Sequence, residues 1–552
     1  MALTKSLKEI IAEDKTGLLG KHASWERVCL RDVAEVLNGY PFESNLFQSA
    51  NGMPLIRIRD VQTGSTNTYF SGEFDNQFLV NPGELLVGMD GDFNSARWKA
   101  KPSLLNQRVC KLTVDERLYS ERLLELVLPG FLAAIHSETS SVTVKHLSSR
   151  SIQEIELPLP PAAEQTRIVE KLEELLSDLD AGVAELKAAQ KKLAQYRQSL
   201  LKAAVEGALT ADWRAARRAN AESFDPSFPR RRESSSGGAP QTLDPRLRGD
   251  DEAQTGAQLL ARILTERRSR WQTRQLAKFE AQDKAPPKDW QAKYPEPVAP
   301  DTAGLPALPL GWVWASAEQL CDFITKGTTP SKGLDGAGDK VIPFLRVTDL
   351  TDKGVLDMAD KVFVSEETHR GFLARSVVYP SDVLMNIVGP PLGQVSVVPE
   401  TFPEWNINQA IAIYRAVNGV LSGFLSLTLL APPAQRWLKA RSKTTAGQTN
   451  LTLEVCRSLP IALPPLAEQQ ALISVADEAI NRVAEQSQAI QISLKQSAAQ
   501  RKNILQAAFS GQLVPQDPAD EPASALLARI RAARAARKAG SATGRGKMKV
   551  ST

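Results

Sequence analysis

Apolar positions recur with a seven-residue period in one long stretch of the chain. From Ile168 to Leu200, apolar or alanine residues return at alternating steps of four and three. This spacing is typical of a helix that packs against a partner helix. Pro160 and Pro161 suit the helix start because proline has no N–H to leave unsatisfied, and Gly207 suits the C-terminal cap. The pattern predicts a helix of about 45 residues, about 65 Å long.

The chain also repeats itself. The sequence Leu-Pro-Pro-x-Ala-Glu-Gln occurs twice, with its glutamates at Glu164 and Glu468, and Gly207 and Gly511 stand at the same offset of 304 residues. A constant offset leaves no room for an insertion and predicts a second long helix after the second motif. Two such helices in one chain would most simply pair antiparallel. Two unrelated amphipathic helices, each packed on its own domain, are the alternative.

Apolar runs of strand length precede each long helix, separated by breaks that contain glycine or proline. They are Leu55–Val61, Glu84–Met89, Arg108–Val114, Val383–Val388 and Ala410–Val417. The stretches 121–135 and 422–440 are expected to form helices interrupted at their middles. Matching runs in the two halves drift in offset from 289 to 304, so their loops differ in length. Each half is therefore predicted to be a variable α/β part followed by a rigid helical part.

A third copied piece follows each helical part, with Leu259 in the first copy and Leu526 in the second. The offset there falls to 267, so the first half carries about 37 extra residues between Gly207 and Leu259. The segment 224–251 is rich in Pro, Ser, Gly and Arg, and we interpret it as a disordered insertion. Its run of three arginines, 230–232, is interpreted as a solvated run and not as a DNA-binding patch.

Composition narrows the class of protein. The 552 residues are 42% hydrophobic and 24% charged, which suits a globular chain of two to four domains. We expect no membrane span and no signal peptide. The four cysteines are scattered without a CxxC pair, which argues against a metal site or disulfide framework and favours a cytoplasmic location. Because the net charge is only +4, a DNA-binding face would need local clusters of basic residues.

Catalytic motifs are missing from the sequence. The chain has no phosphate-binding GxxxxGK[ST] loop, no GxGxxG after a strand, no HExxH, no GxSxG, and no Asn-Pro-Pro-aromatic motif of amino-methyltransferases. None of the four histidines is paired with another, and the carboxylates are not clustered. We therefore expect a non-catalytic chain. A single-chain restriction and methyltransferase enzyme with undetected motifs, or a coiled-coil scaffold that does not bind DNA, are the alternative functions.

The order of these motifs resembles a known family. A variable domain, the Pro-Pro-x-Ala-Glu-Gln element and a long helix occur twice, from about Trp25 to Val514. Each variable domain begins near a tryptophan, Trp25-Glu26 or Gly311-Trp312, and carries an Asn-Gln pair, 106–107 or 408–409. This arrangement is similar to HsdS, the specificity subunit of type I restriction–modification systems. The insertion at 224–251 and a basic tail depart from that pattern.

The resemblance implies an α+β fold, in which two mixed α/β target-recognition domains are separated by two long antiparallel helices with a pseudo-two-fold repeat. Each domain would read half of a bipartite site in double-stranded DNA, with the helices as a ruler. The helices would also dock methyltransferase subunits, probably two, and restriction subunits would join them. The implied cofactors are S-adenosylmethionine, ATP and Mg, all bound by those partner subunits and none by this chain.

The implied domains have the following boundaries. They are a first target-recognition domain (1–156), a first long-helix region (157–210), a linker with the insertion (211–300), a second target-recognition domain (301–456), a second long-helix region (457–515) and a basic helical or disordered tail (516–552).

Candidate DNA contacts are polar and basic residues of the two variable domains, because Arg, Lys, Asn, Gln, Ser and Thr read base edges or bind phosphate. Arg57 and Arg346 occupy equivalent positions and suit a shared structural or phosphate-binding role. Arg97 and Lys443 differ between the halves and are the preferred candidates for discrimination. For any single candidate, a solvated or salt-bridged role is the competing interpretation. The candidates are Arg57, Arg59, Arg97, Lys99, Lys101, Lys145, His146, Ser149 and Arg150 in the first domain, and Lys326, Thr328, Thr329, Lys332, Arg346, Lys439, Arg441, Lys443 and Gln448 in the second.

Overall fold

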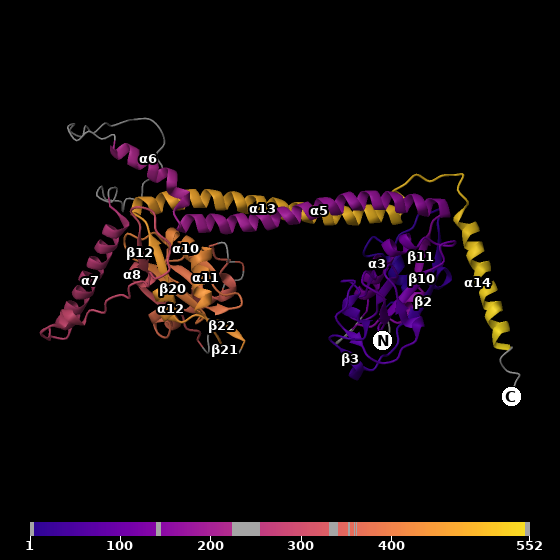
Figure 1. The fold of residues 1–552 in the computed structure, drawn as a ribbon, viewed down its shortest axis with the longest axis horizontal. Coiled ribbons are helices and arrows are strands. Elements are labelled where there is room, and N and C mark those ends of the chain that lie inside the picture. Colours follow the sequence, from indigo (N-terminus) through magenta and orange to yellow (C-terminus); the bar gives the residue numbers. More distant parts are fainter. Residues whose placement is uncertain are drawn as a thin grey trace. The chain divides into compact units, whose positions relative to one another are not determined.

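The structure is a computed structural model that describes residues 5–139, 145–222, 254–330, 340–351, 354–357, 359, 362–445 and 447–546. The predicted insertion at 224–251 and the candidate Lys332 lie outside these residues. The chain forms two compact units (Figure 1). Unit 1 comprises Met1–Ala188 and Ile490–Thr552, and unit 2 comprises Ala189–Ala489.

Unit 1 begins with short helices and strands that lead into a long helix. Its elements are α1 (Leu7–Glu13), β1 (Glu26–Cys29), α2 (Leu30–Val33), β2 (Ala34–Asn38), β3 (Phe47–Gln48), β4 (Met53–Ile56), the 3₁₀ turn η2 (Ile58–Asp60), β5 (Tyr69–Phe70), β6 (Leu79–Val80), β7 (Leu85–Gly88), β8 (Asn94–Arg97), β9 (Ser103–Leu105), β10 (Val109–Val114), α3 (Glu121–Ser137), α4 (Ser149–Gln153), β11 (Glu156–Leu159) and the first part of α5 (Ala162–Val205). The last part of α13 (Leu466–Phe509) and α14 (Ala523–Gly546) complete it.

Two sheets position the loops of unit 1. One has the strand order β2-β10-β7-β8 and is antiparallel throughout. The other has the order β3-β5-β4-β9-β6, with β4 and β9 parallel. Strands β1 and β11 pair separately and bring the start of the domain beside the start of α5. Leu85, Val87, Cys110 and Leu112 alternate along their strands and are buried in one core with α3, while Leu86 and Val109 are buried in a second cluster.

Unit 2 repeats this plan with extra elements. They are the end of α5, η4 (Ala208–Thr210), α6 (Ala211–Glu222), α7 (Gly256–Ala281), η6 (Trp290–Lys293), β12 (Val313–Ser316), α8 (Ala317–Leu320), β13 (Cys321–Lys326), β14 (Lys340–Leu345), η7 (Val347–Asp349), β15 (Phe363–Ser365), α9 (Glu366–Arg370), β16 (Val383–Asn386), β17 (Val388–Gly389), β18 (Val395–Val397), β19 (Asn406–Ile407), β20 (Ile411–Ala416), α10 (Ser422–Leu430), α11 (Pro432–Ala440), β21 (Lys443–Thr445), β22 (Gln448–Asn450), α12 (Leu453–Ser458), β23 (Pro460–Leu463) and the first part of α13.

The main sheets of unit 2 correspond to those of unit 1, although the sheet around β14 has three strands where the sheet around β4 has five. The order β13-β20-β16-β18 corresponds to β2-β10-β7-β8, the parallel pair β14 and β19 corresponds to β4 and β9, and β12 with β23 corresponds to β1 with β11. Unit 2 also has a small sheet, β17-β22-β21, and in unit 1 the bridge between Asp90 and His146 corresponds to its β17–β22 pairing. The structure therefore confirms the internal repeat of two α/β domains.

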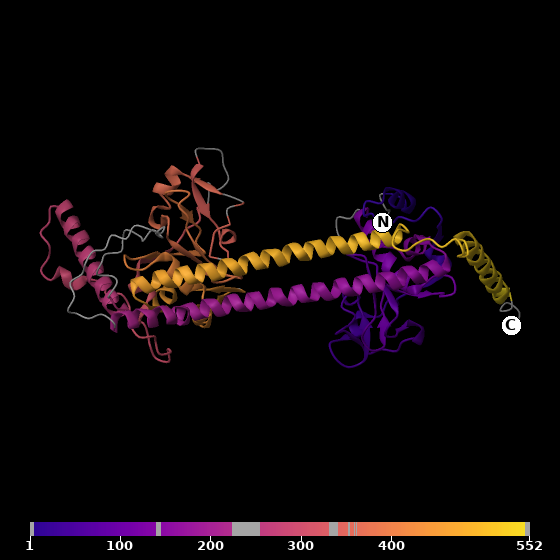
Figure 2. The ribbon, with the colours of Figure 1, turned by 90° about the horizontal axis from the view of Figure 1, so that it is seen from above.

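The two long helices are continuous over 44 residues each and run antiparallel within each unit (Figure 2). In unit 1, Arg501 of α13 forms an ion pair of 2.5 Å with Asp180 of α5. In unit 2, Leu200 of α5 packs with Ala479 and Val483 of α13. These contacts confirm that one helix covers the apolar stripe of the other. Among the described residues, we find no helix with a stretch long and apolar enough to cross a bilayer.

Two local predictions were wrong. Helix α3 continues through Pro129 without a break. This proline is exposed, whereas nine other residues of the helix are buried and hold it against the domain. The proline therefore removes a hydrogen bond without breaking the helix. The strand expected over 55–61 ends at Ile56, because the Asp60 carboxylate accepts the N–H of Arg57 at 2.9 Å and turns the chain. The interruption predicted within 422–440 is confirmed between α10 and α11.

Candidate DNA interface

One edge of the four-stranded sheet in unit 1 gathers several loops. Strands β2 and β7 end there, at Asn38 and Gly88, and the antiparallel strands β10 and β8 begin there, at Val109 and Asn94. The parallel partners β4 and β9 also end on this side, so that Arg57 and Asn106 follow them. We call the loops that leave these strand ends the loop edge of unit 1.

A glycine lets two of these loops touch. The N–H of Tyr40 donates to Leu105 O, and the N–H of Gln107 donates back to Tyr40 O, both at 2.9 Å. Gly39 lies between the end of β2 and Tyr40. A Cβ on this residue would lie 2.0 Å from the carbonyl oxygen of Asn106. Only glycine permits this approach. The contact holds the Asn-Gln pair in place and leaves the Gln107 side chain exposed at the loop edge.

A polar cluster flanks Gln107. Arg108 is exposed and adopts a φ of 74°, which is uncommon for a residue with a side chain. Its guanidinium lies 3.4 Å from a carboxylate oxygen of Asp90 and 3.2 Å from the ring of His146. His146 is also hydrogen-bonded to Asp90 at 2.5 Å. Three loops therefore converge on one exposed set of hydrogen-bonding groups.

Two sequence-predicted candidates lie beside this cluster. Lys145 precedes His146 and donates to His136 O at 2.7 Å. The Ser149 hydroxyl accepts a hydrogen bond from the side chain of Asn38, the last residue of β2, at 3.2 Å. The structure thus brings the segment 145–149 to the loop edge.

Unit 2 builds the equivalent loop edge with different residues. A Cβ on Gly327 would lie 2.1 Å from Ile407 O, so this glycine repeats the role of Gly39. Gln409, the counterpart of Gln107, is exposed and accepts a hydrogen bond from Thr329. Thr328 accepts from Arg375 at 2.9 Å. Lys326 is exposed at the end of β13.

A hairpin, β21 and β22, extends this edge in unit 2. Strand β17 follows β16 and pairs with β22, which pairs with β21. Lys443 and Gln448, on β21 and β22, are exposed. In Figure 1 this hairpin lies at the end of unit 2 remote from α13.

Arg57 and Arg346 occupy the same turn in the two units. Each follows a strand of the parallel pair, and each donates its N–H to an aspartate three residues later, at 2.9 Å to Asp60 and 2.7 Å to Asp349. The Arg346 guanidinium also binds Asp349 at 3.1 Å, whereas the Arg57 side chain is exposed. The shared backbone turn explains why both halves retain this Arg-x-x-Asp spacing.

Arg97, Lys99 and Lys101 lie elsewhere. Arg97 pairs with Leu85 at the opposite end of β8, away from the loop edge. Its guanidinium binds Glu125 at 2.7 Å and Glu121 at 3.0 Å, both on α3. Arg97 and Lys99 line a groove of about 1030 Å³ between the domain and the parts of α5 and α13 in unit 1. The sequence grouped these residues with the segment 145–150, but the fold separates them.

The other candidates lie outside the two polar clusters. Arg59 is 3.8 Å from Asp60, and Arg150 binds Glu154 at 3.0 Å on α4. Lys101 lies over the ring of Tyr69, 5.6 Å from its centre. Lys439 is exposed on α11, and Arg441 stacks on the ring of Trp437, 4.1 Å from its centre.

Gln107, Gln409 and Arg108 were not among the sequence candidates. The Asn-Gln pairs were recognised as a repeated motif, and each half also carries a glycine directly after its first long strand. The sequence did not show that these two signals meet in space, because the contact joins segments about 70 to 80 residues apart.

The repeated Glu-Gln element anchors each domain to its long helix. The buried carboxylate of Glu164 accepts hydrogen bonds from the indole of Trp25, at 2.9 Å, and from Gln516, which follows α13. The side chain of Gln165 accepts the N–H of Ser120 at 2.8 Å and donates to Pro160 O at 3.1 Å. The start of α5, the start of the domain and the segment after α13 therefore meet at one point of unit 1.

Unit 2 repeats this junction. Glu468 accepts from the indole of Trp312 at 2.9 Å and from Thr210 at 2.7 Å, and it also binds Arg214. Gln469 accepts the N–H of Leu421 at 2.9 Å. Thr210 and Arg214 follow α5, just as Gln516 follows α13. The Glu-Gln motif shared by the halves is thus a structural joint.

Comparison with known proteins agrees with this geometry. Residues 23–188 and 309–496 match the family described as "Type I restriction modification DNA specificity domain". The chain belongs to this family. It is 33% identical over 548 residues to the "Type I restriction enzyme EcoBI specificity subunit" of Escherichia coli, covering 97% of this chain and 98% of the relative.

More distant relatives match in part. The EcoKI specificity subunit of Escherichia coli strain K12 is 27% identical over 177 residues, which cover 29% of this chain and 38% of the relative. A chain from a solved structure of the type I R-M system covers 88% of this chain and 98% of its own length, with a TM-score of 0.54 and 16% identity. This likeness supports the fold. The family match and the 33% identity over nearly the whole chain place it among the type I restriction–modification specificity subunits.

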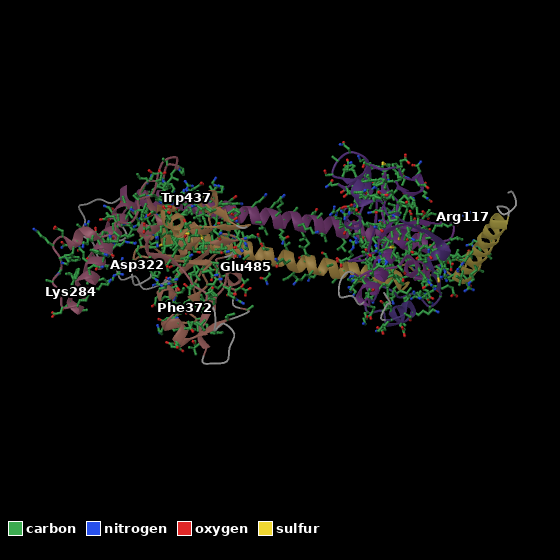
Figure 3. The ribbon with its side chains drawn as sticks, turned by 90° about the horizontal axis from the view of Figure 1, so that it is seen from below. Arg117, Lys284, Asp322, Phe372, Trp437 and Glu485 are labelled. Carbon is green, nitrogen blue, oxygen red and sulfur yellow. The ribbon has the colours of Figure 1, made fainter. Side chains whose placement is uncertain are left out.

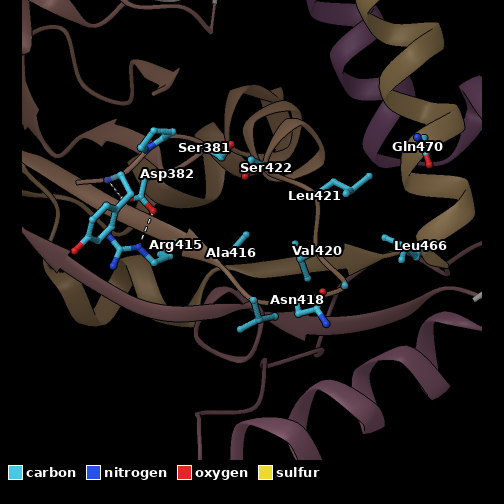
Figure 4. Close-up of a pocket in the computed structure, with 14 residues that line it drawn as sticks. Ser381, Asp382, Arg415, Ala416, Asn418, Val420, Leu421, Ser422, Leu466 and Gln470 are labelled. Atoms are coloured by element: carbon cyan, nitrogen blue, oxygen red, sulfur yellow. Dashed lines mark hydrogen bonds and ion pairs between the residues drawn. The ribbon is translucent and has the colours of Figure 1, made fainter. Parts of the chain in front are cut away.

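One cavity of this specificity subunit is lined by charged groups, as an active site would be, but these groups bind one another (Figure 4). It measures about 350 Å³ and lies beside β20 in unit 2. Asp382 binds two nitrogens of Arg415, at 2.8 and 2.7 Å, and Arg415 also donates to Val377 O. The guanidinium lies between the rings of Phe323 and Tyr379. These groups brace the sheet, and we assign them no catalytic step.

Within the described ranges, no three His, Cys, Asp or Glu side chains are grouped so that they could hold a metal ion. Burial raises the pKa of the Cys110 thiol to about 12 and that of Cys456 to about 11, so these thiols are not nucleophiles near neutral pH.

Proposed function

We propose that this chain reads a bipartite DNA site, with the loop edge of each unit reading one half. The observation that carries the proposal is the duplicated edge, in which Gly39 and Gly327 hold an exposed glutamine, Gln107 or Gln409, among loops that differ between the units. A shared scaffold with different loops is suited to two different half-sites.

The chemistry of the edges matches base reading. Glutamine can form two hydrogen bonds with adenine, and arginine or lysine can bind guanine in the major groove. Gln107 and Arg108 in unit 1, and Gln409, Lys443 and Gln448 in unit 2, carry these groups. Lys145, Ser149, Lys326, Thr328 and Thr329 flank them and suit base or phosphate contacts.

Arg57 and Arg346 suit phosphate binding, because arginine binds phosphate oxygens and such contacts position the protein without selecting a sequence. Arg97, Lys99 and Lys101 lie at the other end of their sheet, and Arg97 is already bound to two carboxylates. We therefore transfer the preferred role in discrimination from Arg97 to Gln107 and Arg108, and keep Lys443 in unit 2.

The paired helices would set the spacer between the half-sites. Each has 44 residues, about 66 Å at 1.5 Å per residue. A continuous helix is stiff, and two that share a seam are stiffer, so their length would limit which spacers the two edges can bridge.

We also propose that the chain acts within a complex. Methyltransferase subunits, two in keeping with the internal repeat, would bind S-adenosylmethionine and modify adenine, and restriction subunits would supply ATP-driven and Mg-dependent steps. The chain itself would contribute recognition and no chemistry.

Methylation-aware sequencing of the source genome tests the proposal. We expect one split adenine-methylated motif that disappears when this gene is deleted and returns when it is restored. A motif that persists after deletion would contradict it. Purified chain incubated alone with labelled S-adenosylmethionine and DNA is the control, and any methyl transfer there would favour the single-chain enzyme instead.

A further inference from the structure

Unit 2 has an apolar pocket on its surface that the DNA-reading role does not use. It measures about 350 Å³ and is bounded by the end of α5, the segment before β12, helices α10 and α11, and strand β23. Trp314, Trp437, Leu305, Leu308 and Pro433 are among the side chains that line it. Trp437 is half-buried on the surface of the unit (Figure 3).

The same place in unit 1 is covered. The strand pairs β1–β11 and β12–β23 align Arg27 with Trp314 and Glu156 with Pro460. In unit 1, helix α1 lies over this position. It packs on α3, which corresponds to α10 and α11, and its Lys8 is 3.9 Å from Glu156. Ile10 of α1 is only 4% exposed and belongs to the core of the unit.

Among the described residues of unit 2, no such helix covers the pocket. The segment between η6 and β12 is fully described, and it contains no helix that corresponds to α1. An amphipathic helix with one deeply buried isoleucine thus closes this position in unit 1, and no helix of the described residues closes the equivalent position in unit 2. Half-buried tryptophan and aliphatic side chains around a pocket are typical of a protein-binding site.

The charges at the ends of α3 and α11 are opposite, and Glu206, which also lines the pocket in unit 2, lies 3.8 Å from Lys202. In unit 1, Lys5 and Lys15, on either side of α1, pair with Glu138 at the end of α3, at 4.0 and 2.5 Å. In unit 2, the end of α11 carries Lys439, followed by Arg441, whose guanidinium stacks on the Trp437 ring that lines the pocket. A helix that seats here therefore needs acidic flanks, whereas α1 from a second copy of this chain would bring lysines.

We propose that this pocket binds an amphipathic helix of a partner protein, with an aliphatic side chain that enters the pocket as Ile10 enters unit 1 and with acidic residues beside Arg441. Helix-in-groove binding of this kind is a recurring mode of recognition. This interaction is independent of DNA reading, because the pocket residues are not part of either loop edge.

Peptides test this proposal on the full-length chain. The acidic probe is the segment 5–17 with Lys5, Lys8 and Lys15 replaced by glutamate and a fluorescent label added. The matched peptides are the unaltered, lysine-bearing segment and the acidic probe with Ile10→Asp. Fluorescence anisotropy should show the acidic probe binding about tenfold or more tightly than either control.

Two variants of the chain locate the binding. Ala434→Phe places a ring in the pocket and should weaken binding of the acidic probe about tenfold or more. Arg441→Glu changes an exposed side chain, so that the fold is retained, and should reverse the preference toward the lysine-bearing peptide. The proposal is overturned if the acidic probe does not bind, if neither variant alters its binding, or if the unmodified lysine-bearing peptide binds the wild-type chain more tightly, which would indicate a second copy as the occupant.

Discussion

Individual residues divide into those that hold the domains and those that could face DNA. Glu164 and Glu468 are almost completely buried, and their hydrogen bonds join three chain segments in each unit. A buried carboxylate needs such donors, because an unpaired one carries a large desolvation penalty. The two joints differ in one respect, since Glu468 also binds Arg214, whereas Glu164 has the neutral donors Trp25 and Gln516.

This difference predicts unequal effects of removing the indole N–H. Trp25→Phe should lower the free energy of unfolding by about 1–3 kcal/mol, because Glu164 keeps only one of its described donors. Trp312→Phe should have a smaller effect, because Thr210 and Arg214 still satisfy Glu468. Urea unfolding followed by circular dichroism measures both. Equal losses, or a larger loss for Trp312→Phe, would contradict this account of the joints.

A second prediction concerns acid stability. Burial alone would raise the pKa of Glu125, but hydrogen bonds and charges from Arg122 and Arg97 outweigh it and hold the pKa below its usual value. A carboxyl with a depressed pKa stabilises the folded state above its unfolded pKa, about 4.3, and loses that contribution as the pH falls through the folded pKa.

Thermal unfolding of the wild type and Glu125→Gln from pH 7 to pH 3 checks this sign. The wild type should be more stable at pH 7, and the gap should close below about pH 4. Glu173→Gln, which removes a half-exposed partner of Arg122, is the control and should change stability little. A gap that stays constant over this range would show that the charge of Glu125 does not stabilise the fold.

At the scale of elements, the local hydrophobic pattern predicted the long helix and several strands. The heptad seam indicated α5, and strand-length apolar runs indicated β7, β10, β16 and β20. The end of β4 was missed because it depends on the side chain of Asp60, and α3 was wrongly expected to break because the exposure of Pro129 comes from packing. The positions of Arg97 and Gln107 depend on sheet register, which the chain's local pattern does not contain.

The loop edge depends on a close approach between elements, and Gly39 tests it. Gly39→Ala would place a Cβ 2.0 Å from the carbonyl oxygen of Asn106, so the loop that carries Gln107 must move. We expect impaired recognition of one half-site and a lower unfolding temperature. Gly20→Ala is the matched control, because nothing lies within 4 Å of its added Cβ. Unchanged half-site discrimination in Gly39→Ala would remove this loop from the interface.

At the scale of the whole molecule, α5 and α13 each run from one unit into the other. The ion pair between Asp180 and Arg501 sets the antiparallel register, and residue 186 then stands opposite residue 495. An insertion that preserves the pairing must therefore be made in both helices and must be a whole heptad.

Seven residues inserted after Leu186 and seven after Lys495 should lengthen the pair by about 10 Å, or about three base pairs. The methylated motif should keep both half-sites and gain a longer spacer, as sequencing of modified DNA would show. An insertion in α5 alone is the control and should disrupt the helix pair. Altered half-site sequences with an unchanged spacer would contradict the ruler.

The central claim is that two independent edges of one chain read the two halves of the site. The most direct test uses Gln107→Ala and Gln409→Ala, each assembled with methyltransferase subunits. Methylation is measured on duplex libraries in which one half-site at a time is randomised. We predict that each substitution relaxes methylation specificity in one half only, and in opposite halves. Specificity that stays intact in both variants, or that changes in both halves with either one, would contradict the account.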